Sequence, residues 1–424
     1  MTIKTAEALL SPISVFEFVE KYLEKEVLFL QRHSPSLVEG LFDLESLGQC
    51  LKIARPYLDG RVRVLRKGEP ERSRLLKNVS KKEAIARLTE TFAEGHTIIL
   101  NGAEDYWQPV ADLCDALQET LVCAVSCNIY CTPPVSQGFE THVDNHDVII
   151  LQTQGSKTWR THETHFELPL ESRWQLDEFR SELKSAEPEY GDPNRELVLN
   201  PGDVLYLPRG VPHSAMSNSD ATVHFTIGLH PVRTHALLHH VIDMIAHRDV
   251  RLRQRIDHKI ITGAESPPTP GDLLREIAKF ADELDEPFGL DRLLSRFRET
   301  LLPMNDLAGA FRSASQCAAI HLNTRVARPP GTTLSFRDKG EELWVICGSS
   351  SVALPLRLRD AISFLTEREE LRIGEIPDKL LSKRSKVVFI RHLLKHGLLR
   401  ITELGDKPPI DIQEYERIFS TKAS

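Results

Sequence analysis

The residues best suited to chemistry lie in the segment THVDNHDVIILQTQGSKTW, residues 141–159. His142 and Asp144 are good metal ligands, and the unbroken apolar run after them predicts a buried strand. Residues two apart in a strand share a face, so these two side chains can chelate one ion. The turn at 154–156 folds the chain back, so we expect Lys157 to begin the neighbouring strand and point inward. An unpaired buried ammonium is costly, and this lysine therefore needs an anion.

The pattern His-x-Asp/Glu is not specific by itself, because the chain also contains His165/Glu167 and His247/Asp249. Residues two apart on a helix point about 200° away from each other. The pair at 247 and 249 lies in a helical segment and cannot converge on one ion. The pair at 165 and 167 lies in a polar loop without a clear third ligand. The pair at 142 and 144 remains, and it also needs a third ligand to form a convincing metal site.

That third ligand is predicted in PGDVLYLPRGVPHSAMSN, residues 201–218, whose spacing is close to the second cupin motif. Gly202 permits a tight turn, 204–207 reads as a short inward-packing strand, and Pro208 with Gly210 shapes the next turn, which aims His213 inward. Two histidines and one carboxylate form the facial triad typical of non-haem Fe(II), which leaves positions open for a bidentate 2-oxo acid and O2. The alternative is three unrelated polar residues at strand ends, and the joint pattern favours the triad.

Two other sets of possible metal ligands are weighed against structural roles. His235 and His239 are one helical turn apart and could hold zinc, but no catalytic glutamate accompanies them, so solvated or interface histidines are favoured. Cys123, Cys127 and Cys131 recur every four residues in an apolar strand-like run, which places them on one face as small core residues.

Composition limits the class of protein. The chain has 424 residues, 41% of them hydrophobic, which is enough for two or three globular domains. The formal net charge of −8 gives no global reason to expect nucleic-acid binding. The seven cysteines lack a dense disulfide spacing, and we find neither a secretory signal nor a run of eighteen apolar residues. We expect a soluble, cytoplasmic protein without a membrane partner.

The texture of the chain changes twice. Helical spacing in VFEFVEKYLEKEVLFL, DLESLGQCLKI and KKEAIARLTETFAEG precedes short β-branched runs between about 97 and 230, which predict a β-sandwich or barrel. After Pro231 the pattern is helical again, and the segment 235–256 carries the apolar stripe Leu238, Val241, Ile242 and Ile245. A loop is expected at 264–272, and residues 356–401 read as helix, short helix, longer basic helix and strand, as in a winged helix.

Together these segments resemble the JmjC-type cupin 2-oxoglutarate oxygenases, nearest to the ribosomal oxygenase branch. The resemblance rests on SPISVFEFVEKYLEKEVLFLQR, NIYCTPPVSQGFETHVDNHDVIILQTQGSKTWR and LNPGDVLYLPRGVPHSA, and it spans nearly the whole chain. It implies an α+β fold, a double-stranded β-helix (cupin or JmjC jelly roll) with flanking helices. The implied domains are a catalytic domain with N-terminal helices at 1–232, a helical dimerisation region at 233–330 and a winged-helix domain at 331–424. A homodimer formed through the helical region is expected.

The resemblance also assigns roles to residues. His142, Asp144 and His213 match the iron ligands, and Lys157 matches the basic residue that pairs with the distal carboxylate of 2-oxoglutarate. Asn128 matches a co-substrate contact and Tyr130 a substrate-side position. Strand parity agrees, since these last two share one face and the thiols the other. The structural alternatives are an asparagine that only satisfies backbone groups, a core tyrosine and a surface lysine.

One position departs from the family pattern. Related proteins often carry a serine on the late strand as a further co-substrate contact, and the aligned residue in VHFTIGLH is Gly228. Thr226 or His224 could substitute for that contact.

The function implied is Fe(II)- and 2-oxoglutarate-dependent hydroxylation, using O2, of a protein side chain, with a ribosomal protein histidine or arginine as the expected target. One alternative is a 2-oxoglutarate enzyme that demethylates N-methyl-lysine or tailors a peptide natural product. A second is a non-enzymatic DNA-binding regulator with a ligand-sensing cupin, suggested by the basic segment KRSKVVFIRHLLKHG. Because four glutamates lie just upstream and the chain is acidic, a solvated basic face is favoured over sequence-specific nucleic-acid binding.

Overall fold

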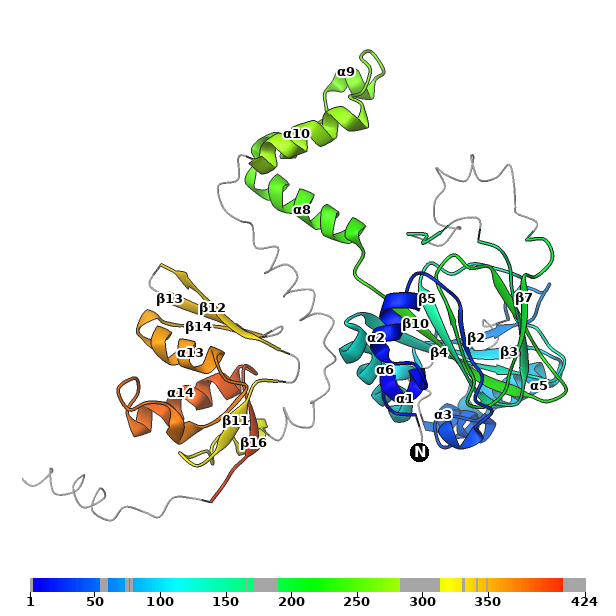
Figure 1. Cartoon of the computed structure of the whole chain (residues 1–424), viewed down its shortest axis with the longest axis horizontal. Helices are drawn as coiled ribbons and strands as arrows, with labels where there is room; N and C mark the ends of the chain where they lie inside the picture. The colour runs from blue at the N-terminus through cyan, green and yellow to red at the C-terminus, as the bar shows by residue number, and fades with distance from the viewer. Residues whose placement is uncertain are drawn as a thin grey trace, which may run out of the picture. The chain divides into compact units, whose positions relative to one another are not determined.

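The structure is a computed structural model of the chain. It describes residues 3–53, 60–72, 76, 79–164, 167–170, 190–282, 313–329, 332–340, 342–347 and 350–406. The chain divides into two compact units, Met1–Arg233 and Thr234–Ser424, and each is described by itself (Figure 1).

The first unit is built on two antiparallel sheets. The larger has seven strands in the order β1-β8-β5-β10-β4-β3-β2, and the smaller has three in the order β7-β6-β9. Their bounds are β1 Leu28–Leu30, β2 Val62–Leu65, β3 Thr97–Leu100, β4 Ala124–Thr132, β5 Asp147–Gln154, β6 Lys157–Thr161, β7 Arg195–Leu199, β8 Val204–Leu207, β9 His213–Ser217 and β10 Thr222–His230. Two facing antiparallel sheets are the jelly-roll arrangement expected of a cupin.

The turn at Gly155 passes the chain from one sheet to the other. Gly155 has φ +62°, and a Cβ there would lie 2.4 Å from the carbonyl oxygen of Ala221, so only glycine fits. The expectation that 154–156 returns the chain to an adjacent strand is wrong: β5 pairs with β8 and β10, whereas β6 pairs with β7 and β9. Lys157 therefore begins a strand of the opposite sheet.

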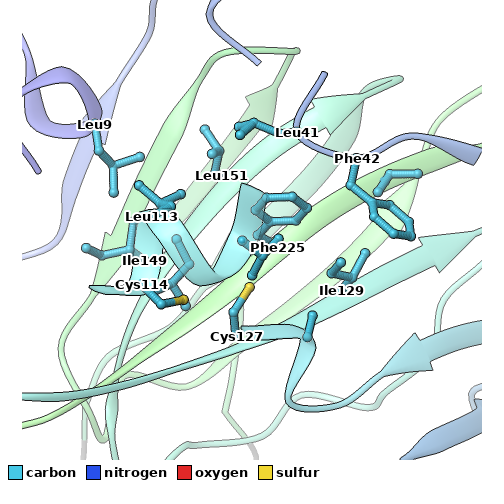
Figure 2. Packing of buried hydrophobic residues seen from close by; sticks show 14 of the residues in the cluster. Leu9, Leu41, Phe42, Leu113, Cys114, Cys127, Ile129, Ile149, Leu151 and Phe225 are labelled. Carbon is cyan, nitrogen blue, oxygen red and sulfur yellow. The ribbon is translucent and has the colours of Figure 1, made fainter. Parts of the chain in front are cut away.

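The two faces of the large sheet contact different partners. Its outer face packs against helices in the larger core, where Leu9 of α1 (Ala6–Leu10) and Leu113 of α6 (Gln108–Leu121) meet Ile129, Ile149 and Phe225 of the strands (Figure 2). Its inner face, through Val148 and Ile150, joins Trp159 of the small sheet in a second, smaller core. The alternation predicted for strands thus separates a helix-covered face from the barrel interior.

The cysteines of the β4 region behave as predicted. Cys123, Cys127 and Cys131 are buried thiols in the helix-covered core, and the other four cysteines are also buried thiols. Tyr130, between two of them in sequence, lies on the opposite face, as strand parity requires.

The N-terminal helix predictions are partly confirmed. Helices α3 (Leu44–Ile53) and α5 (Lys81–Ala93) form where their spacing predicts them. The prediction is wrong for the second half of VFEFVEKYLEKEVLFL. Helix α2 (Val15–Glu17) continues as a π-helical turn over Phe18–Tyr22, and the helical structure ends at Leu23. The following residues form β1, which pairs with β8. Pairing with an open sheet edge has overridden the local helical spacing.

The second unit begins with three helices, α8 (Thr234–Arg248), α9 (His258–Ile261) and α10 (Pro270–Asp282). Later residues form two three-stranded sheets with the orders β15-β11-β16 and β12-β13-β14, which share one hydrophobic core with two helices. The bounds are β11 Arg325–Ala327, β12 Leu334–Lys339, β13 Glu342–Cys347, β14 Ser350–Pro355, α13 Arg359–Thr366, β15 Glu370–Arg372, α14 Lys383–Lys395 and β16 Arg400–Glu403. The winged-helix assignment stays a prediction.

The basic helix α14 presents fewer cations than its sequence suggests. Lys386 is buried and donates to Asp378 at 2.6 Å, and Arg391 donates to the carbonyl oxygen of Cys317 at 3.0 Å. None of the helices within the described ranges is long and apolar enough to cross a bilayer.

Candidate active site

Two histidines from distant parts of the sequence meet at the edge of the small sheet. His142 and His213 form an isolated antiparallel bridge, in which each backbone N–H donates to the carbonyl oxygen of the other residue, at 3.1 and 2.9 Å. Their ring centroids are 4.5 Å apart. The bridge brings together two side chains that are about seventy residues apart in the chain.

The hydrogen bond made by Nδ1 of each imidazole determines which ring nitrogen is free to bind a metal. Nδ1 of His142 lies 2.9 Å from the carbonyl oxygen of Glu140, and Nδ1 of His213 lies 2.9 Å from that of Val211. A carbonyl oxygen only accepts, so each Nδ1 carries the proton, which leaves the Nε2 lone pair as the ligand atom. Burial and the neighbouring His142 lower the pKa of His213, which favours its neutral, metal-binding form.

Asp144 completes the group of ligands. Its Oδ2 lies 3.6 Å from Nε2 of His213, and one ligand atom from each of the three residues falls within 4.8 Å of the others. In the part of the chain that the structure describes, this is the one cluster of three or more His, Cys, Asp or Glu side chains with such geometry. The predicted pair therefore does converge with the predicted third residue.

A cavity opens beside these three residues into the barrel, and Lys157 lies on its wall. The lysine side chain is 4% exposed, and its Nζ donates to Thr132 Oγ1 at 3.1 Å. Among the described residues no carboxylate forms an ion pair with it. Burial lowers the pKa of Lys157 to about 7, because an ammonium is poorly stabilised where water is excluded.

His224 and Tyr130 form another wall of the same cavity. Their rings stack, with centroids 4.8 Å apart, and Trp159 meets His224 edge-on at 5.3 Å. His224 is 2% exposed, and its Nδ1 is buried without a hydrogen-bond partner. Burial and the nearby Lys157 lower the pKa of His224, so the ring is neutral. This Nδ1 and a lysine that no described carboxylate neutralises lie side by side in the cavity wall, where a polar, anionic ligand would satisfy both.

The remaining predicted residues lie at different depths. Thr226 lines the cavity, whereas Asn128, its partner across the β4/β10 ladder, does not and accepts a hydrogen bond from the N–H of Gly102 at 3.1 Å. At Gly228 a Cβ would lie 2.8 Å from His146 Cδ2. The ring of His146 therefore occupies the space that a serine would need.

Several residues that line the cavity were missed by sequence reasoning. Trp159 could have been found by parity, since it is two residues from Lys157 on the same strand. Phe139 also lines the cavity, with its ring 5.2 Å from that of His142. It belongs to a loop, where no periodic signal exists to predict orientation.

The rival metal ligands do not reach a comparable arrangement. The rings of His235 and His239 are 4.3 Å apart on α8, without a third ligand among the described residues. His165, of the second His-x-Glu pair, lies outside the described residues.

Comparison with known proteins agrees with this geometry. Residues 104–237, which include His142, Asp144, His213 and Lys157, match the JmjC domain family. This segment is a JmjC domain. The domain lies in the unit that carries the two facing sheets.

Relatives of this chain are named as oxygenases, hydroxylases and demethylases. The chain is 31% identical over 229 residues to the bifunctional lysine-specific demethylase and histidyl-hydroxylase NO66 of Drosophila persimilis, covering 50% of this chain and 32% of the relative. It is 31% identical over 315 residues to ribosomal oxygenase 2 of Rattus norvegicus, covering 68% of this chain and 61% of the relative. The chain thus spans less than two thirds of the length of either relative.

Among solved structures, the chain is similar to the ribosomal oxygenase YcfD of Escherichia coli in complex with cobalt and 2-oxoglutarate. The TM-score is 0.48 at 16% identity, over 92% of this chain and 99% of that one.

Proposed function

We propose that this protein is an Fe(II)- and 2-oxoglutarate-dependent oxygenase that hydroxylates a side chain of a protein substrate. One observation carries the proposal: a buried lysine, which pairs with no carboxylate among the described residues, faces the same cavity as a group of two histidines and one aspartate. An anion with a metal-chelating end would satisfy both features at once.

The residues present fit iron. Two neutral imidazoles and a carboxylate are the donor set of the facial triad, and both imidazoles have the tautomer that leaves Nε2 free. Bound iron and 2-oxoglutarate would activate O2, which would supply the oxygen atom transferred to the substrate. The protein supplies ligand geometry, charge and protection from water.

The residues also fit 2-oxoglutarate. Lys157, charged and donating to Thr132, would bind the distal carboxylate, while the unpartnered Nδ1 of His224 would satisfy a second polar atom of the same molecule. Val148 and Ile150 on β5 would cover its methylene carbons. Thr226 lines the same cavity and would be a further contact. Asn128 does not line the cavity and would act only through Thr226, its partner across the β4/β10 ladder.

We infer a protein side chain, histidyl or arginyl, on a ribosomal protein as the substrate. Support comes from the relatives named histidyl-hydroxylase and ribosomal oxygenase. Tyr130 and Phe139, whose ring centroids are 6.3 Å apart, offer an aromatic wall for a planar group. The name of the Drosophila relative also contains lysine-specific demethylase, so N-methyl-lysine demethylation is the second candidate.

The test is turnover of 2-oxoglutarate by the full chain, loaded anaerobically with Fe(II), in the presence of a mixture of ribosomal proteins. We expect succinate formation and a gain of one oxygen in a protein product by mass spectrometry, both absent with Asp144→Ala. Loss of a methylene unit from a methylated lysine would select the demethylase instead. A protein that binds Fe(II) but never consumes 2-oxoglutarate would contradict both.

A further inference from the structure

The segment that carries Asp144 is held against the turn that leads into His213 by an ion cluster whose arginine and aspartate are buried. Arg209 donates its backbone N–H to Asp147 Oδ1 at 2.8 Å, and its guanidinium lies 3.4 Å from Asp147 Oδ2. The same guanidinium donates to Glu24 Oε1. Arg209 is 6% exposed and Asp147 fully buried, so neither charge is solvated on its own. We name these three residues the Arg209 cluster.

The cluster is one end of a short ladder. At the other end His142 and His213 exchange two backbone hydrogen bonds, and between them the N–H of Gly210 donates to the carbonyl oxygen of Asp144 at 3.0 Å. Asp144 is therefore fixed between the histidine bridge and the Arg209 cluster. It is the one metal ligand that lies in neither a strand nor a bridge, since β5 begins only at Asp147.

The N-terminal segment closes the cluster at a strained position. Glu24 has φ +59°, in the left-handed region that residues other than glycine rarely adopt. Its backbone N–H donates to the hydroxyl of Tyr206 at 2.8 Å, which holds this conformation on β8. The conformation brings the carboxylate of Glu24 onto Arg209, so a second anion balances a cation that Asp147 alone meets only at 3.4 Å.

We propose that Asp147 and Arg209, with Glu24, are positioning residues that set the spacing between the carboxylate of Asp144 and the imidazole of His213. Without the carboxylate of Asp147 the 208–210 turn loses its charged anchor, and the two ligands can separate. Metal affinity should then fall, because groups that support ligands typically change affinity by about 10- to 100-fold. The inference rests on the metal site of the proposed function.

The experiment measures Co(II) binding to the full chain, by calorimetry and by the visible spectrum of the bound ion, together with the melting temperature. Asp147→Asn keeps the shape of the side chain and the Oδ1 atom that accepts the backbone N–H of Arg209, but it removes the negative charge. We expect its Kd for Co(II) to rise roughly 10- to 100-fold and its cobalt spectrum to change. A native chain that does not bind Co(II) at all would refute the proposed function rather than this inference.

The matched control is Asp378→Asn in the second unit. It also deprives a buried cation of its partner, since Lys386 is 3% exposed and donates to Asp378 at 2.6 Å. Both variants should melt earlier, but only Asp147→Asn should change the Co(II) affinity and spectrum. A Kd for Asp147→Asn within twofold of the native value would overturn the proposal.

Two milder variants decide the matter if Asp147→Asn does not fold. Glu24→Gln leaves the Asp147 contacts in place, and Arg209→Lys keeps the charge while losing the planar geometry. Each should raise the Kd for Co(II) several-fold. Native affinity in both would show that the cluster only stabilises the fold.

Discussion

We expect Lys157→Ala to weaken 2-oxoglutarate binding by about ten- to a hundredfold at pH 7. The loss follows from one charge-assisted hydrogen bond, worth roughly 1.5–3 kcal/mol, at about 1.4 kcal/mol for each factor of ten. Metal binding should be largely spared, because the ligand set does not include the lysine. Lys157→Arg should keep partial affinity, since the charge remains while the shape changes.

The pH dependence of binding tests the same reasoning. Burial lowers the pKa of Lys157 from its usual 10.5 to about 7, so the empty site holds a neutral amine above pH 7. The distal carboxylate of 2-oxoglutarate favours the ammonium, so binding takes up a proton. Affinity should therefore be flat below about pH 6 and fall by about tenfold for each unit above pH 7, at 1.36 kcal/mol per unit. In Lys157→Ala this dependence should vanish.

The assay is calorimetric titration of the Co(II)-loaded chain with 2-oxoglutarate between pH 6 and 9, in buffers that differ in ionisation enthalpy. At pH 8 the native chain should take up close to one proton on binding, and neither Lys157 variant should. Succinate formation as a function of 2-oxoglutarate concentration gives an independent affinity. Unchanged affinity in Lys157→Ala, or a native affinity that stays constant from pH 7 to 9, would refute the assignment of this lysine to the co-substrate.

Four further outcomes are expected. Asp144→Ala should abolish turnover in a folded protein, because two histidines alone do not complete the triad; full 2-oxoglutarate consumption by it would exclude this site. Gly228→Ser should lower the free energy of unfolding by roughly 1–3 kcal/mol, since its Cβ would lie 2.8 Å from His146 Cδ2 and 2.9 Å from Ser126 Oγ. Adding His146→Ala should restore part of the loss in chemical denaturation, because the contact with Ser126 remains. Light scattering should show a homodimer at micromolar concentration, because α8 leaves Leu238 56% exposed and Ile242 38% exposed; a monomer would contradict this. The second unit should bind duplex DNA only weakly and without sequence preference, with affinity that falls steeply with salt, and salt-resistant binding to one sequence would revive the regulator hypothesis.

Local periodicity predicted the parts of the site that lie on one strand or one motif. Alternation places Tyr130 and the buried thiols of β4 on opposite faces, because the side-chain alternation of a strand depends only on its own backbone. His142 and Asp144 converge as predicted, but for another reason than the one predicted, since Asp144 precedes β5 and does not lie in a strand. The helices α3 and α5 were predictable for the same reason as the alternation of β4, with a period of 3.6.

Contacts between segments far apart in sequence were decided by the tertiary structure alone. The VLFL end of VFEFVEKYLEKEVLFL forms β1 because it pairs with the open edge of β8. Lys157 lines the cavity from the small sheet because the chain passes from one sheet to the other at Gly155. The sequence by itself determined which side chains could bind a metal and an anion. The tertiary structure decided that they meet, through the bridge of His142 with His213 and the attachment of Arg209 to Asp147. Such pairings depend on sheet register and sheet packing, which no single segment encodes.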